Sequence, residues 1–254
     1  MKTIAIHSYK GGTGKTSIAV NLAALSAIKG RNVCILDYDF RAPSLQVAFK
    51  ENPRFWLNDF LEGNINFQDA LIELTRKYDF KGRFLVGFAN PNSQALRNMM
   101  TKDRIWEMRA LHKTLSAKRS LNQEMGVELL IFDTSPGMIY SSINALASSD
   151  LIFIVMKGDE YDLEGTKELI NGIYEVLGKK TQVILNKIPL NYFSKEASEL
   201  LKASIQEKLG LPIAGLIPCD CNLLATGGKS IIAINQPNHP FIKALSDIID
   251  KIQL

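Results

Sequence analysis

Short apolar runs alternate along the chain with longer stretches of helical periodicity. Runs that are nearly continuous in Ile, Val, Leu and Phe are typical of strands buried on both faces. They are Thr3–Ser8, Val33–Asp37, Glu128–Asp133, Leu151–Met156 and Gln182–Asn186, with weaker signals at Arg83–Phe88 and Ile213–Ile217. Helical patterns lie at Lys15–Lys29, Asn66–Tyr78, Thr101–Glu124, Asp162–Leu177, Ser194–Leu209 and Pro240–Ile252.

This alternation predicts a doubly wound α/β fold, with a mostly parallel sheet of about seven strands and helices on both faces. No repeat, low-complexity stretch or linker interrupts the chain, so we expect one domain over residues 1–254. Ligands of such sheets bind at the carboxyl ends of the strands. Polar segments do follow the predicted strands, and they are Lys10–Ser17, Asp37–Asp39, Asp133–Gly137, Asn186 and Pro218–Asp220.

Composition narrows the class of protein. Hydrophobic residues make up 46% of the 254 residues and charged residues 22%, which is ordinary for a globular protein and argues against disorder. The three cysteines are few and odd in number, which argues against a disulfide scaffold and favours a reducing compartment. No apolar stretch approaches the roughly 18 residues of a membrane span, and the first residues lack a signal-peptide pattern. We therefore expect a cytoplasmic protein.

A glycine-rich loop follows the first predicted strand and opens the first predicted helix. Glycines let backbone N–H groups turn inward and the helix N-terminus adds its positive dipole end, so the loop favours phosphate. The pattern predicts that the loop binds ATP, with Lys15 contacting the β- and γ-phosphates and the Thr16 hydroxyl binding Mg²⁺. The expected nucleotide-binding residues are Gly11, Gly12, Thr13, Gly14, Lys15, Thr16 and Ser17. The alternative is a structural turn.

Carboxylates end two further strands. Asp37 and Asp39 follow the second strand, and Asp133 begins the segment Asp-Thr-Ser-Pro-Gly137 after a strongly apolar strand. Carboxylates accept hydrogen bonds from water and attract hard cations. Taken singly, each has the alternative of a helix cap or turn.

Together these segments resemble the ParA/MinD family of deviant Walker A P-loop ATPases. Tyr9 stands where the standard loop has its first glycine, and Lys10 adds a second lysine. The resemblance implies that Lys10, Lys15 and Asp39 are catalytic. Lys10 would reach the partner's phosphates across an ATP-dependent homodimer, delivering a cation where charge develops. The alternative for Lys10 is a solvated surface lysine.

The resemblance also assigns roles around the magnesium ion. Thr16, Asp37 and Asp133 would hold Mg²⁺ or its water shell, and Asp39 would orient the attacking water. Gly137 would lie near the γ-phosphate. The family often has proline where this chain has Ser135, a mild departure.

The base site is implied by the family's use of an Asn and a Pro-containing loop around adenine. Asn186, Pro218 and Asp220 match those places, and an amide can both donate to and accept from a purine edge. Turn formation is the competing interpretation. The similarity covers nearly the whole chain and is weakest over residues 42–128.

The implied activity is slow, partner-stimulated ATP hydrolysis that drives a positioning or partitioning switch for a cargo such as DNA or division or surface machinery. Arg97–Arg119 carries seven cations against two acids. DNA phosphates, acidic lipid or an acidic protein are its candidate partners, which would recruit the protein to the nucleoid or the inner membrane surface. A solvated helix face is the alternative.

Two other classes stay open. Cys219 and Cys221 would share a metal in a metal or iron–sulfur maturation ATPase of the same superfamily, with plain packing as the alternative. Asp37–Ser44 also resembles bacterial-type tyrosine kinases, but the tyrosine-rich tail of those kinases is missing after Tyr192.

Overall fold

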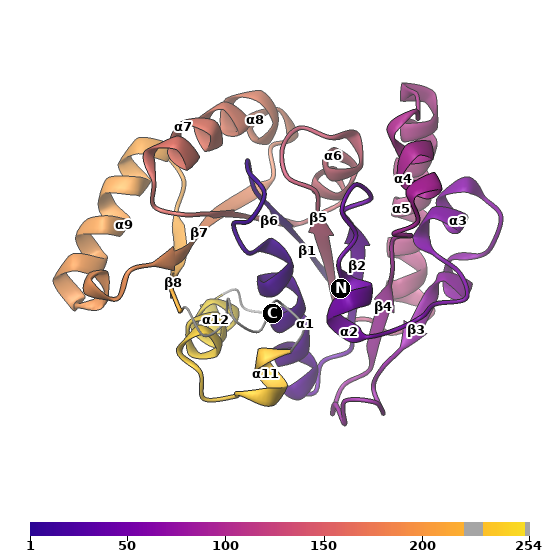
Figure 1. Cartoon of the computed structure of the whole chain (residues 1–254), viewed down its shortest axis with the longest axis horizontal. Helices are drawn as coiled ribbons and strands as arrows, with labels where there is room; N and C mark the ends of the chain where they lie inside the picture. Colours follow the sequence, from indigo (N-terminus) through magenta and orange to yellow (C-terminus); the bar gives the residue numbers. More distant parts are fainter. Residues whose placement is uncertain (221–230, 252–254) are drawn as a thin grey trace.

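The computed structural model describes residues 1–220 and 231–251. The strands are β1 (Lys2–His7), β2 (Val33–Tyr38), β3 (Leu71–Glu73), β4 (Phe84–Gly87), β5 (Leu129–Thr134), β6 (Leu151–Met156), β7 (Lys180–Ile188) and β8 (Ile213–Pro218). They form one sheet in the order β3-β4-β2-β5-β1-β6-β7-β8 (Figure 1). All neighbours are parallel except β3, which runs antiparallel to β4. The doubly wound fold is confirmed, with one edge strand beyond the seven expected.

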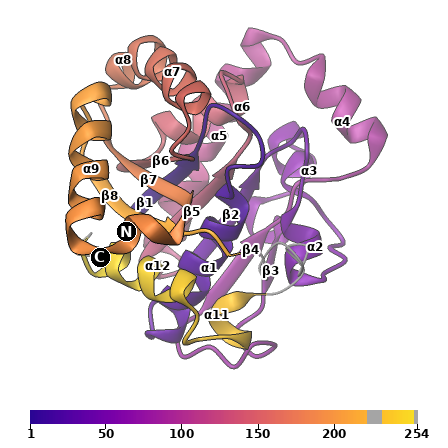
Figure 2. The same cartoon turned by 60° about the vertical axis from the view of Figure 1, so that its left-hand side comes forward.

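Helices cover both faces of this sheet (Figures 1 and 2). They are α1 (Lys15–Ile28), α2 (Leu45–Phe49), α3 (Leu57–Glu62), α4 (Ser93–Met100), α5 (Arg104–Gln123), α6 (Tyr140–Ala147), α7 (Glu160–Leu169), α8 (Glu175–Leu177), α9 (Lys195–Leu209), α11 (Ile232–Asn235) and α12 (Pro240–Lys251). A π-helical turn, η2 (Ile170–Tyr174), joins α7 to α8. Helices α1, α2, α11 and α12 pack on one face, and α3, α5, α6, α7 and α9 on the other.

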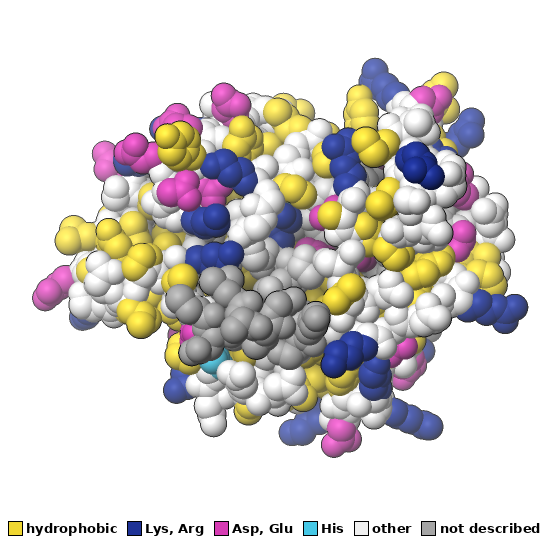
Figure 3. Space-filling view, in the orientation of Figure 1, with side chains coloured by type: hydrophobic (Ala, Val, Ile, Leu, Met, Phe, Trp, Pro, Cys, Tyr) yellow, Lys and Arg dark blue, Asp and Glu magenta, His cyan; other side chains and the backbone are white. Residues whose placement is uncertain are grey.

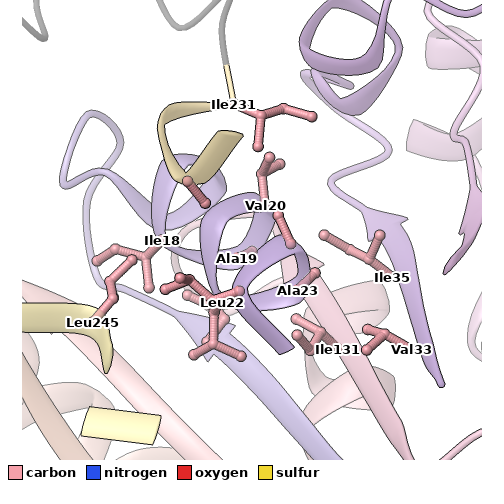
Figure 4. Close-up of a cluster of buried hydrophobic side chains, with 14 of the residues drawn as sticks. Ile18, Ala19, Val20, Leu22, Ala23, Val33, Ile35, Ile131, Ile231 and Leu245 are labelled. Atoms are coloured by element: carbon pink, nitrogen blue, oxygen red, sulfur yellow. The ribbon is translucent and has the colours of Figure 1, made fainter. Parts of the chain in front are cut away.

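The core lies on both sides of the sheet. In β1, Ile4 and Ile6 pack with α1, whereas Ala5 packs with the opposite helices. Helix α1 is buried on nearly all sides because α11 and α12 cover its outer face, as Figure 4 shows with Leu245 of α12. Each large apolar side chain buried in this way contributes about 1.5–3 kcal/mol. This packing holds the N-terminus of α1 at the carboxyl edge of β1.

Strand register brings three polar loops to that edge. Asp37 in β2 pairs directly with Asp133 in β5, and Ile6 in β1 pairs with Asp133 on its other side. The loops that follow β1, β2 and β5 therefore leave the sheet side by side. This is the edge where parallel sheets of this class bind ligands.

The helix predicted over Asn66–Tyr78 is wrong. The structure has a short 3₁₀ segment, η1 (Phe67–Ala70), and then β3. The amide of Leu74 donates to the carbonyl of Phe84, and the amide of Phe84 donates to the Thr75 hydroxyl. Pairing with β4 thus satisfies the backbone of this segment, and tertiary context overrides its helical spacing.

Several short helices had no counterpart in the prediction, namely α2, α3, α4, α6 and α11, whereas the stretch predicted over Asp162–Leu177 covers α7, η2 and α8. Helix α4 is only eight residues long and buries none of them. In the part of the chain that the structure covers, no helix is long and apolar enough to cross a bilayer.

Candidate nucleotide site

The glycine loop between β1 and α1 requires glycine at two positions. Gly12 and Gly14 have φ angles of 75° and 98°, in the left-handed region that other residues rarely adopt. A Cβ atom on Gly14 would also lie 2.3 Å from Asn186 Nδ2. That amide nitrogen donates to the Thr13 carbonyl oxygen at 2.7 Å. The Asn186 side chain of β7 therefore helps to hold the conformation of the glycine loop.

Lys15 is buried within this loop. Its ammonium group donates to Ser8 Oγ at 3.0 Å, and the Ser8 hydroxyl donates to the Lys10 carbonyl oxygen at 2.6 Å. Burial lowers the pKa of Lys15, while the charges of Asp133 and Asp39 oppose the shift. The predicted nucleotide-binding residues Gly11, Gly12, Thr13, Gly14, Lys15, Thr16 and Ser17 all lie in this loop or the first turn of α1. A buried cation in a glycine loop at a helix N-terminus suits a polyanion.

Two completely buried carboxylates face each other beside the loop. Asp37 accepts the amides of Asp39, Ser44 and Leu45 at 3.1–3.2 Å. Both oxygens of Asp133 are buried, and neither has a hydrogen-bond partner among the described residues. Burial raises the pKa of both carboxyl groups, and repulsion from Asp133 raises that of Asp37 further, whereas the nearby Thr16 hydroxyl and the Lys15 charge oppose the rise at Asp133.

This arrangement fits a magnesium ion. An unpaired buried carboxylate is costly unless a cation or donor satisfies it. Mg²⁺ is commonly held by one or two carboxylates together with phosphate oxygens and water. The oxygens of Asp133 are open for this role, whereas those of Asp37 are already engaged by backbone amides. The Thr16 hydroxyl, which accepts from Ser44 Oγ at 3.2 Å, supplies a further oxygen in the same region.

Asp39 lies at the rim of the site, half-buried. Its Oδ1 accepts the Ala42 amide at 3.0 Å and the Ser135 hydroxyl at 2.6 Å. The residue that departs from the family pattern is thus bonded to the carboxylate expected to orient water. Sequence reasoning noted Ser135 but had no signal for this contact, because the two residues are far apart in the chain.

Lys10 lies over helix α7. Its ammonium is 3.9 Å from Asp162 Oδ1 and 5.5 Å from the centre of the Tyr161 ring, and its side chain is 41% exposed. Asp162 is buried and Tyr161 is exposed. Lys10 therefore sits apart from the Lys15 pocket, at the molecular surface, where a second molecule can approach it.

The strand that leads into the loop makes two more contacts with this helix region that sequence reasoning missed. The Tyr9 ring packs on Gly165, where a Cβ atom would lie 2.0 Å from the ring. The buried His7 ring contacts Tyr174 Oη at 2.5 Å through Nδ1 and the Gly137 carbonyl oxygen at 3.1 Å through Nε2. A carbonyl only accepts, so Nε2 carries the proton and Nδ1 accepts from the tyrosine hydroxyl.

The residues expected around the base are spread over two elements. Asn186 uses one amide hydrogen on Thr13, and its oxygen accepts the Lys187 amide at 2.9 Å. Pro218 ends β8, and Asp220 Oδ2 contacts His239 Nε2 at 2.9 Å. Asn186 thus supports the loop, and its contact with adenine stays a prediction, as do those of Pro218 and Asp220.

The cysteine pair is only partly within the described residues. Cys219 is half-buried in the loop after β8, with its amide donating to the carbonyl of Ile188 at 2.8 Å. Cys221 lies outside the described residues. Across residues 1–220 and 231–251, no group of three or more His, Cys, Asp or Glu side chains is placed to hold a metal ion.

The basic stretch Arg97–Arg119 is less free than its charge suggests. Lys102 pairs with Glu62, Lys113 donates to the carbonyl oxygens of Phe60 and Leu61, and Lys118 pairs with Asp150. Among the described residues, Lys113 has only these carbonyl oxygens as hydrogen-bond partners, and the arginines of the stretch that form no ion pair are Arg97, Arg104, Arg109 and Arg119. In Figure 3 the dark blue side chains over α4 are separated by other surface. The patch is therefore a set of separate arginines, smaller than the sequence suggests.

Comparison with known proteins connects this geometry to a family. A family profile described as AAA domain matches residues 1–187. An uncharacterized ATP-binding protein of Methanocaldococcus jannaschii is 28% identical over 98% of this chain and 86% of its own length. The septum site-determining protein MinD of Thermotoga maritima is 24% identical over 98% of this chain and 87% of its own length.

A solved structure shares the fold. The septum site-determining protein MinD of Pyrococcus horikoshii, complexed with Mg-ADP, superposes with a TM-score of 0.77 at 19% identity. The match covers 99% of this chain and 95% of that one.

Proposed function

The chain belongs to the ParA/MinD family of P-loop ATPases, and from this premise we propose that it binds Mg·ATP at the glycine loop and hydrolyses it to ADP and phosphate. The observation that carries the proposal is that two buried charges lie in one site: Lys15, whose ammonium donates to Ser8 Oγ, and Asp133, whose oxygens have no partner at hydrogen-bond geometry among the described residues. A phosphate tail with its magnesium ion satisfies both charges at once.

Each residue of the site has a task that its position supports. Lys15 and the amides of residues 11–16 hold the phosphates, while Thr16 and Asp133 supply oxygens for Mg²⁺ and Asp37 adds negative charge behind them. Bound Mg²⁺ neutralises charge that develops on the phosphate oxygens. Asp39 accepts a hydrogen bond from the attacking water and so aligns it for in-line attack.

We propose that ATP also brings two copies of the chain together, face to face at the carboxyl edge of the sheet. Lys10 supports this part of the proposal because it lies outside its own Lys15 pocket and remains 41% exposed. A cation that reaches a neighbouring molecule's phosphates is useful only in an assembled state, which makes hydrolysis depend on assembly.

The cellular role that fits is a switch in spatial positioning, because the Thermotoga maritima relative is a septum site-determining protein. The ATP-bound dimer would engage a partner or surface, and hydrolysis, slow until a protein partner stimulates it, would release it. Arg97, Arg104, Arg109 and Arg119 are the cations that DNA or an anionic membrane would meet.

The test separates binding from hydrolysis. Asp39→Ala removes the group proposed to align water but none of the groups proposed to hold ATP. We expect ATP affinity within about twofold of the parent and a loss of phosphate release of at least about a hundredfold. Lys81→Ala, an exposed change before β4, serves as the control and leaves both unchanged. Normal phosphate release by Asp39→Ala would remove this residue from the mechanism.

A further inference from the structure

The loops after β2 and β5 are joined by a hydrogen bond between two side chains. Ser135 Oγ donates to Asp39 Oδ1 at 2.6 Å, and Ser135 is completely buried. The last paired residues of these strands are Tyr38 and Thr134. Asp39 and Ser135 are therefore the first residues beyond the ladder on each strand, and their contact continues the strand pairing through side chains.

Ser135 is itself held firmly. Its carbonyl oxygen accepts the Ser142 hydroxyl at 2.9 Å, which ties its backbone to the first turns of α6. Asp39, by contrast, lies on a loop at the rim of the site, where an unrestrained carboxylate samples several rotamers. The hydrogen bond from the firmly held Ser135 thus restrains the more exposed Asp39 side chain.

Both donors to Asp39 select the same oxygen. The Ala42 amide and the Ser135 hydroxyl bind Oδ1, and among the described residues Oδ2 receives no hydrogen bond. The carboxylate plane is fixed by this pair of donors, while one oxygen keeps its full accepting capacity. This is the arrangement that a group needs if it is to align a water molecule.

We propose that Ser135 is a positioning residue, which fixes the Asp39 carboxylate so that its second oxygen accepts from the attacking water. The inference rests on the proposed function, in which Asp39 aligns that water. Proline, which the resembling family often has at this place, offers no hydroxyl. The chain therefore has an added link between the loops after β2 and β5.

The experiment compares Ser135→Ala with a matched control, Ser149→Ala. Ser149, just beyond the end of α6, is also completely buried and donates its hydroxyl to the Ala145 carbonyl oxygen of that helix at 2.7 Å. For Ser135→Ala we expect kcat to fall about tenfold with KM unchanged, because one hydrogen bond to a charged group is lost. Ser149→Ala is expected to keep the parent's kcat even if its melting temperature falls as much as that of Ser135→Ala. In an Asp39→Ala background, Ser135→Ala has no further effect on kcat.

A second readout needs no nucleotide. Amide hydrogen exchange at Ala42 reports whether Asp39 is held, since that amide donates to the same oxygen. We expect Ser135→Ala to speed exchange at Ala42 and Ser149→Ala to leave it unchanged. If Asp39→Ala has lost hydrolysis but Ser135→Ala keeps both the parent's kcat and the parent's exchange rate at Ala42, the inference about Ser135 is overturned. If Asp39→Ala itself hydrolyses ATP normally, the proposed role of Asp39 fails and this inference fails with it.

Discussion

At the scale of single residues, the site contains a buried carboxylate that destabilises the nucleotide-free protein. Asp133 is buried and neither of its oxygens has a partner at hydrogen-bond geometry among the described residues; burial raises its pKa, although the nearby Thr16 hydroxyl and the charge of Lys15 oppose the shift. When folding raises the pKa of a carboxyl group, the folded protein becomes less stable as the pH rises from the group's unfolded-state pKa through its folded-state pKa. The site therefore favours protonation, or a cation, at this position.

Replacing this carboxylate tests that account. Asp133→Asn is expected to raise the melting temperature of the nucleotide-free protein by a few degrees at neutral pH, because it removes a buried charge. The same change is expected to abolish the further rise that Mg²⁺ with ATP gives the parent. Thermal unfolding with and without ligand measures both effects.

The control is Asp150→Asn. Hydrogen bonds from Lys118 and the Thr3 amide help to hold the pKa of Asp150 below its usual value. This group contributes stability above its unfolded pKa, so its removal lowers the melting temperature. Equal shifts for the two variants would contradict the account of Asp133.

His7 gives a pH dependence of the opposite sign, although burial is again the main cause. Burial lowers its pKa to about 4 from 6.5, while its bond to the Gly137 carbonyl oxygen opposes the shift. The unfolded chain takes up this proton first as the pH falls, so stability declines from pH 6.5 toward pH 4, by about 3 kcal/mol in total. His7→Gln donates and accepts without titrating and is expected to lose that part of the slope.

Urea unfolding over this pH range provides the measurement, with each variant compared to the parent so that other groups cancel. His112→Gln, an exposed change on α5, is expected to keep the parent's slope. A parent-like slope in His7→Gln would show that His7 is accessible to protons in the folded state.

The sequence predicts which segments meet where the order of strands decides position, while the roles of single residues stay predictions. The segments around Lys15, Asp37 and Asp133 meet because the carboxyl ends of adjacent parallel strands meet, and strand patterns reveal those ends. Side-chain contacts such as that of Asn186 with Thr13 depend on packing between residues 173 positions apart. One sequence carries no signal for such pairs.

At the scale of elements, helix α7 shows how a local rule is overridden. Glycine in a helix interior costs about 1 kcal/mol relative to alanine, yet Gly165 lies within α7. The Tyr9 ring occupies the space that its side chain would need. The same kind of override removed the helix predicted over Asn66–Tyr78, where β4 provides backbone partners.

Gly165→Ala should therefore destabilise the protein, by about 1–3 kcal/mol, because the added methyl group clashes with the ring. Gly172→Ala is the matched control, since a Cβ atom there meets only Met138 Sδ at an ordinary 3.6 Å. We expect the control to be neutral or stabilising. The double variant Tyr9→Ala, Gly165→Ala recovers stability relative to Gly165→Ala, as chemical denaturation will show; no recovery would contradict the assigned contact.

At the scale of the whole molecule, the parallel sheet gathers the charges and the helices on its two faces hold the loops still. Fold class and the position of the site follow from strand and helix periodicity together with the glycine loop. The edge strand β3 and the short helices α4 and α6 do not, because few residues define each of them. ATP-dependent assembly is the property that we propose at this scale.

Lys10→Ala tests assembly. Lys10 lies outside its own Lys15 pocket, so its loss should leave ATP affinity within about threefold of the parent while ATP-dependent dimerisation and turnover fall at least about tenfold. Light scattering with size-exclusion chromatography in Mg·ATP follows the dimer, and Lys81→Ala again serves as the control. Parent-like dimerisation and turnover of Lys10→Ala would make this lysine a surface residue only.

One measurement bears on all of this most directly: isothermal titration calorimetry of Mg·ATP into the parent chain and into Lys15→Ala. The account predicts one site per chain in the parent and at least about a hundredfold weaker binding in the variant, since Lys15 is the buried cation of the loop. No heat of binding to the parent, or equal affinity for both proteins, would contradict it.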